Sequence, residues 1–143
     1  MTGAGLRTVI GWIPAGLWTG ALYLLLTLQL TVQPSSPLAW PLRIPHIDKA
    51  VHFALFAVLA WLIFMPLRRV RPDLARPTAW LAFGLAALYG AWLEYVQTAL
   101  PYRHGSLADA IANGLGAATV LLAVYGITGR NRLRIRRHPD RTA

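Results

Sequence analysis

The sequence has no cysteine and few charged residues. Disulfides and thiol chemistry are therefore excluded, and the redox compartment is left open. Only 13% of the 143 residues are charged, whereas soluble domains carry roughly 25%. Lysine and glutamate each occur once, as Lys49 and Glu94, so arginine carries almost all of the net charge of +9. Because 56% of the residues are hydrophobic, the composition indicates that a lipid bilayer is the solvent of this chain.

Four long apolar runs occupy about residues 9–32, 49–67, 78–98 and 106–128. Each approaches or exceeds the roughly 20 residues that cross a bilayer as a helix, and none alternates with the period of a strand. The first run is too long for the apolar region of a cleaved signal peptide, so we expect an anchor. Ser106 is placed to cap the last helix. We predict an all-α polytopic membrane protein, with a bundle of four transmembrane helices over residues 1–129 and a basic, disordered tail over 130–143.

The arginines fall mainly on one side of this topology. With the N-terminus inside, the cytoplasmic segments hold eleven Lys and Arg residues and the outer segments hold three, namely Arg43, Lys49 and Arg103. The positive-inside rule therefore places both termini in the cytoplasm and the chain in the inner (plasma) membrane as a multi-pass protein. The basic segments are explained by topology and by anionic lipids, so no nucleic-acid partner is expected.

The remaining polar residues lie at the predicted outer ends of the helices. Asp48 and His52 are four residues apart and share a helix face, as do Ser106, Asp109 and Asn113 on the last helix. Small residues on two sides of the last helix, among them Gly116, suggest that this helix is central. We expect one outward-facing polar pocket formed by Asp48, Lys49, His52, Glu94, Gln97, Arg103, Ser106, Asp109 and Asn113.

Three motifs resemble those of the VanZ-like family of bacterial membrane proteins: Asp48-Lys49-x-x-His52-Phe53-x-x-Phe56, Glu94-x-x-Gln97, and Arg103-x-x-Ser106-x-x-Asp109-x-x-x-Asn113-x-x-Gly116. The resemblance covers about residues 44–124. It implies a small protein of four or five membrane helices. The founding member is linked to low-level teicoplanin resistance, so the resemblance also implies an effect on the cell envelope or on tolerance to glycopeptide-type antibiotics.

The residues favour binding of an anionic lipid or a lipid-linked phosphate. Arg103 and Lys49 would contact the phosphate, His52 and Asp109 would complete the polar shell, and Glu94 with Gln97 would hold Arg103 or Lys49 in place. In the alternative, a membrane-embedded enzyme acts on a lipid phosphate or ester, with acid–base candidates His52, Glu94 and Asp109. His52 and Asn113 could also serve only as interhelical hydrogen-bonding groups.

Other classes of function have less support in the sequence. A small transporter is disfavoured, because polar residues do not continue through the inner half of the bundle. No metal and no cofactor are expected, since no H-x-x-H or H-E-x-x-H spacing occurs. The expected partners are membrane lipids, and a homo-oligomer is possible.

Overall fold

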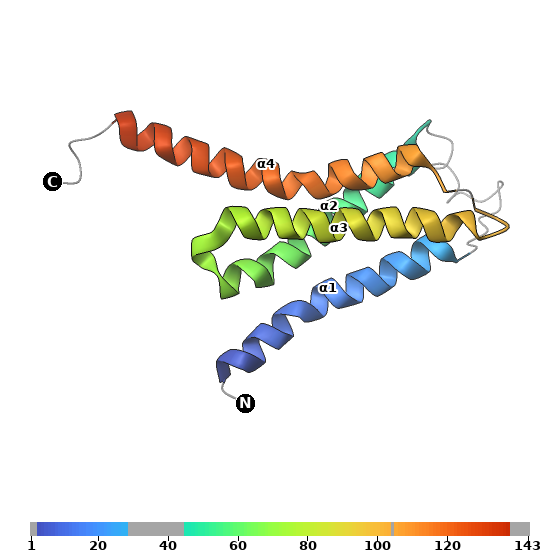
Figure 1. Ribbon diagram of the computed structural model, residues 1–143, viewed down its shortest axis with the longest axis horizontal. Coiled ribbons are helices and arrows are strands. Elements are labelled where there is room, and N and C mark those ends of the chain that lie inside the picture. The colour runs from blue at the N-terminus through green and yellow to red at the C-terminus, as the bar shows by residue number, and fades with distance from the viewer. Residues whose placement is uncertain (1–2, 29–44, 104, 138–143) are drawn as a thin grey trace, which may run out of the picture.

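The described residues form a bundle of four long helices (Figure 1). The computed structural model describes residues 3–28, 45–103 and 105–137, with side chains over 9–28, 45–103 and 105–126. The helices are α1 (Gly3–Thr27), α2 (Ile47–Val70), α3 (Ala75–Thr98) and α4 (Leu107–Arg137), and a short 3₁₀ turn, η2 (Pro72–Leu74), joins α2 to α3. The predicted all-α class is confirmed. The proline-rich segment after the first apolar run lies mostly outside the described residues.

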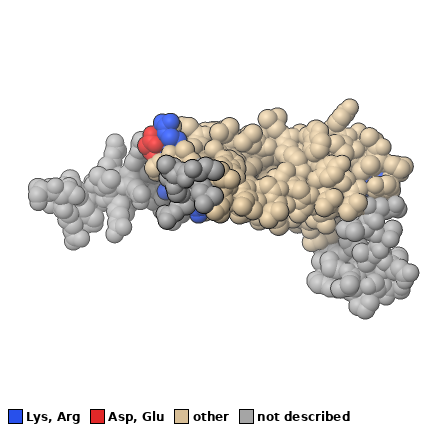
Figure 2. All heavy atoms as spheres, turned by 90° about the horizontal axis from the view of Figure 1, so that it is seen from below, with Lys and Arg blue, Asp and Glu red and all other residues tan. Residues whose placement is uncertain are grey.

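Four segments of the described residues are long and apolar enough to cross a membrane: Val9–Thr27, Ile47–Val70, Pro72–Thr98 and Leu107–Gly126. Their outward surface is apolar, with large side chains such as Leu88 and Leu122 more than 70% exposed. Figure 2 shows a largely uncharged surface along one face of the bundle, with most of the visible charged side chains at the end that carries the α2–α3 connection. Such a belt is unfavourable in water and favourable against lipid tails.

Each helix turns one stripe of side chains into the bundle, and in α2, α3 and α4 this stripe includes ionisable or amide side chains. The α2 stripe contains His52, Phe56, Leu59, Ile63 and Pro66, at alternating spacings of four and three. The α3 stripe ends in Leu93, Glu94 and Gln97, and Asn113 lies on the α4 stripe. Because side chains three and four apart share a helix face, the polar residues are buried by the same packing that buries the apolar ones.

The centre of the bundle is formed by α2 and α3, which each pack against the other helices, whereas α4 packs against α2 and α3. The expectation that the last helix is central is therefore only partly met. Gly116 lies at a close helix contact, as the small-residue pattern predicted, since a Cβ there would overlap the backbone of Phe53 on α2. Glycine at this position lets the two helices approach at backbone distance.

The two ends of the bundle differ. At one end, the start of α1 and the end of α4 lie on the same side as the α2–α3 connection (Figure 1). At the other end, α1 and α3 finish and α2 and α4 begin, and we call this the polar end. In a bilayer, the start of α1 and the end of α4 would therefore lie on the same side. Which side of the membrane that is stays a prediction.

Helix α4 continues past its apolar segment to Arg137. The expectation of disorder from residue 130 onward is therefore wrong for 130–137, while 138–143 lie outside the described residues. At 1.5 Å per residue, its 31 residues extend about 46 Å, which exceeds the roughly 30 Å of a hydrocarbon core. The excess comes at the arginine-rich end, where good helix formers such as Arg and Leu allow the helix to continue.

Candidate functional site

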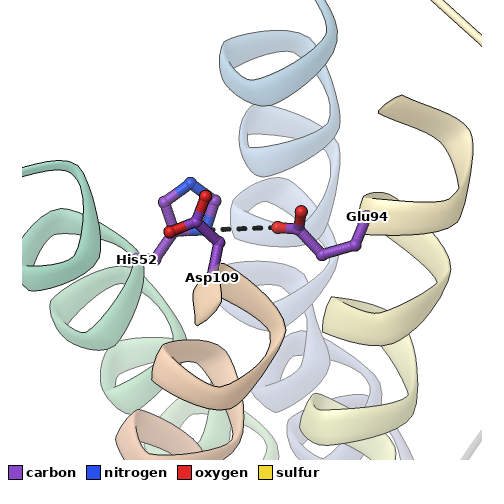
Figure 3. Close-up of side chains that lie close together, drawn as sticks. All are labelled: His52, Glu94 and Asp109. Carbon is purple, nitrogen blue, oxygen red and sulfur yellow. Dashed lines mark ion pairs between the residues drawn. The ribbon is translucent and has the colours of Figure 1, made fainter. Parts of the chain in front are cut away.

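His52 lies at the polar end, in the second turn of α2, and faces two other helices. Its side chain is only 9% exposed. Its Nδ1 is 2.9 Å from Oδ1 of Asn113 on α4 and 3.5 Å from Oε1 of Glu94 on α3. Figure 3 shows His52, Glu94 and Asp109 converging from these three helices. The predicted convergence of distant motifs is therefore observed for these residues.

The amide of Asn113 orients the histidine ring. Its Nδ2 donates to Oε1 of Glu94 over 3.4 Å, and a carboxylate can only accept, so Oδ1 of Asn113 faces His52. An amide oxygen also only accepts, so Nδ1 of His52 is the protonated nitrogen. In the neutral ring, Nε2 then keeps its lone pair. Among the described residues, no hydrogen bond is made by Nε2.

Glu94 connects this cluster to the start of α4. Its Oε2 accepts the backbone N–H of Ser106 at 2.9 Å, and Ser106 Oγ accepts the N–H of Asp109 at 3.4 Å, so Ser106 is the predicted N-cap. In a capping box, the residue at the third helical position accepts the N–H of the cap residue. Here Glu94, from another helix, accepts that N–H. The side chain of Asp109, which occupies the third position, is left to face His52.

Asp109 is 14% exposed, and its Oδ1 is buried without a hydrogen bond to any described residue. The Nζ of Lys49 lies 3.5 Å from this oxygen and 2.8 Å from Oδ2 of Asp48. Lys49 is 36% exposed and Asp48 more so. These two residues thus form a charged rim beside a group that we call the polar cluster, which contains the buried His52, Glu94 and Asn113 and the partly buried Asp109.

Gln97 and Arg103 do not have the neighbours that the sequence suggested. Gln97 Nε2 donates to the carbonyl of Leu26 at 2.8 Å, and Arg103 Nη2 donates to that of Leu28 at 3.5 Å. Both therefore satisfy carbonyls at the end of α1, where a helix lacks its own donors. The expected role of Glu94 and Gln97 in holding Arg103 or Lys49 is wrong, because no contact between described residues joins these pairs.

The sequence model of the VanZ/LLP1 family matches residues 10–128. The chain belongs to the VanZ/LLP1 family. The match extends the resemblance of the three motifs toward the N-terminus and includes most of α1, which carries none of those motifs. Comparison with curated proteins and with solved structures finds no match.

Two glycines of this VanZ/LLP1 protein shape the cluster and were missed as site residues. A Cβ at Gly90 would lie 2.9 Å from Cβ of Asn113, and one at Gly105 would lie 2.6 Å from Cγ2 of Thr98 and overlap the carbonyl of Glu94. Gly90 thus leaves room for Asn113, and Gly105 lets the loop reach Glu94. Gly105 lies within the third motif and Gly90 lies one helical turn before Glu94, so their positions were an available signal. The α1 carbonyls that accept hydrogen bonds from Gln97 and Tyr102 gave no sequence signal, because every residue has a backbone carbonyl.

Proposed function

We propose that this VanZ/LLP1 family protein binds the phosphate-bearing head group of a membrane lipid or lipid-linked envelope precursor at its polar end. The observation that carries the proposal is the convergence of buried or half-buried ionisable groups from three helices at one end of the bundle. Lys49 lies in the first turn of α2 and Asp109 in the first turn of α4, which corresponds to the depth of lipid head groups. Polar groups at the edge of a membrane are costly to maintain without a use.

Two cations at this end are available to an anion. Lys49 is partly exposed, and its ammonium group has three N–H donors. The ammonium pairs with Asp48 and Asp109, which leaves one donor for an anion. The guanidinium of Arg103 makes a single long hydrogen bond to Leu28, and its other N–H groups make none to described residues. An ammonium and a guanidinium together suit a phosphate monoester or diester, because both donate charge-assisted hydrogen bonds.

The proposed consequence for the cell is a change in the envelope. A protein that sequesters or presents a lipid-linked precursor alters its supply, and glycopeptide antibiotics act at such precursors. Family membership supports this part of the proposal through the resistance linked to the founding member. Placement of the polar end on the outer side follows the arginine count and is part of the same proposal.

A second candidate, an enzyme that cleaves a lipid phosphate or ester, is favoured by the histidine. His52 has Nδ1 facing Asn113 and Glu94 and has Nε2 without a hydrogen bond to described residues. A general base needs this combination of one oriented nitrogen and one nitrogen open to substrate. The same residues would then bind the head group and act on it.

Binding of polyprenyl phosphate and of phosphatidylglycerol to the full-length protein in nanodiscs tests the proposal. We expect Lys49→Gln and Arg103→Gln each to weaken binding of at least one of them about tenfold, since a hydrogen bond to a charged group contributes about 1.5–3 kcal/mol. Arg71→Gln is the matched control, because Arg71 is exposed at the opposite end. Unchanged binding in both test variants would refute head-group binding. Phosphate release that is lost in His52→Gln would select the enzyme.

A further inference from the structure

We infer that the polar cluster is a divalent-metal site in which His52, Glu94 and Asp109 are the protein ligands. One possible ligand atom from each residue lies within 4.8 Å of the others. Ligands at about 2.0–2.2 Å from a tetrahedral ion lie about 3.3–3.6 Å apart, so the side chains must move together by about an ångström to close the site. One imidazole nitrogen with two carboxylate oxygens suits Zn²⁺ or Mn²⁺. Three protein ligands also leave a position open for a further ligand.

Two polar atoms of the cluster lack hydrogen bonds to the described residues. Oδ1 of Asp109 is fully buried and has none to the described residues. Nε2 of His52 likewise has none in the part of the chain that the structure describes, although its side chain is nine-tenths buried. Buried polar atoms normally have a partner, and a cation would supply one to each. In metal-binding histidines, the other ring nitrogen characteristically donates to a protein oxygen, as Nδ1 does here to Asn113.

The charge at the polar cluster also calls for a cation. Glu94 and Asp109 contribute two carboxylates, and the exposed Asp48 beside them adds a third that pairs with Lys49. Among the described residues, the only ammonium or guanidinium within ion-pair distance of them is that of Lys49. With a neutral histidine, two negative charges remain uncompensated, and a divalent ion matches this deficit. Buried charges are destabilising when left without a counter-ion. Lys49, 3.5 Å from Asp109, is a partial substitute for the ion.

The sequence pattern concealed this site because each helix contributes one ligand. Short spacings such as H-E-x-x-H reveal only sites that lie on a single helix. Here the three ligands are separated by 42 and 15 residues along the chain. The ion would also attract a phosphate to its open position, and this last step rests on the proposed function, whereas the metal site does not.

Titration of the full-length protein with Zn²⁺ alone and with Mn²⁺ alone tests the inference. The protein is purified in detergent with an affinity tag free of histidine, treated with a chelator, and studied by calorimetry and by elemental analysis. We expect one ion per chain. Asp109→Asn should weaken binding at least 10–100-fold, the range known for loss of groups around metal sites. Asp73→Asn, which changes an exposed carboxylate at the other end, should leave affinity unchanged.

Lys49→Met gives a result that misfolding cannot imitate. Removal of the ammonium beside Asp109 should increase metal affinity several-fold, because the ion no longer competes with a like charge. Failure of the wild-type protein to bind either ion would overturn the inference, as would equal effects of Asp109→Asn and Asp73→Asn. Metal binding by a protein that binds neither lipid would support the site and refute the proposed function.

Discussion

Substitution of Gly116 by alanine should destabilise the bundle and displace α4 from α2. A Cβ at this position would overlap the carbonyl oxygen of Phe53 and lie 2.9 and 3.0 Å from its carbonyl carbon and Cα. These atoms belong to the backbone of a helix, so no side-chain rotation can relieve the clash. The helices must separate locally by about an ångström, and overpacking of this kind typically costs about 1–3 kcal/mol.

Gly114 is the matched control for this substitution. It lies on the same helix, two residues before Gly116, and a Cβ there would meet nothing within 4 Å. Gly114→Ala should therefore be neutral or stabilise the helix by up to about 1 kcal/mol. The two alanine variants should differ in unfolding free energy by about 1–4 kcal/mol, from the overpacking cost and the helix propensity together.

The assay is equilibrium unfolding in mixed micelles, followed by far-UV circular dichroism, for the wild type and both variants. Asn113 lies three residues before Gly116, on the same side of α4, so displacement of the helix should also lengthen its hydrogen bond to His52. Gly116→Ala should consequently weaken binding at the polar end, and Gly114→Ala should not. Equal stability of the two variants would refute the close α2–α4 packing on which this reasoning depends.

Three further predictions concern the helix ends. Gln97→Leu should destabilise the protein by about 1–3 kcal/mol, because the buried carbonyl of Leu26 loses its hydrogen-bond donor, and it should expose the end of α1 to proteolysis. The control Thr98→Val changes an exposed neighbouring residue and should have neither effect. Ser106→Ala should lower the unfolding free energy by about 1 kcal/mol and Ser106→Asp should largely restore it, since aspartate also caps helices. A reporter fused at Arg71 should be cytoplasmic, and an extracytoplasmic result would reverse the proposed orientation.

Much of the fold could be predicted from hydropathy and helix-breaking residues. The run predicted over 78–98 ends at the observed last residue of α3, Thr98, and the predicted cap Ser106 directly precedes α4. Prediction was poorer for the last residue of α1 and for the last residue of α4. Helix α1 ends at Thr27 rather than near residue 32, where its last carbonyls are bound by side chains of α3 and the following loop. Contacts of this kind depend on tertiary structure, which hydropathy does not encode.

The candidate site shows a similar division between contacts within a helix and contacts between helices. Helical periodicity correctly placed Asp109 and Asn113 on a common stripe. It could not choose partners across helices, because these depend on how far each helix is rotated about its axis. Charge alone suggested that Glu94 would hold Arg103 or Lys49, yet Glu94 accepts from the backbone of Ser106 and the amide of Asn113. A helix N-terminus offers N–H donors that composition does not show.

The position of Glu94 makes the start of α4 and the polar cluster parts of one structure. One carboxylate oxygen satisfies the N–H of the cap residue, and the other meets the amide that orients His52. Any change at the cluster that draws Glu94 toward a bound ion must therefore alter its hold on Ser106. Because α4 packs on both α2 and α3, a small movement at its first turn is passed to two neighbouring helices. The proposed binding at the polar end would thus be coupled to the packing of the bundle through Glu94.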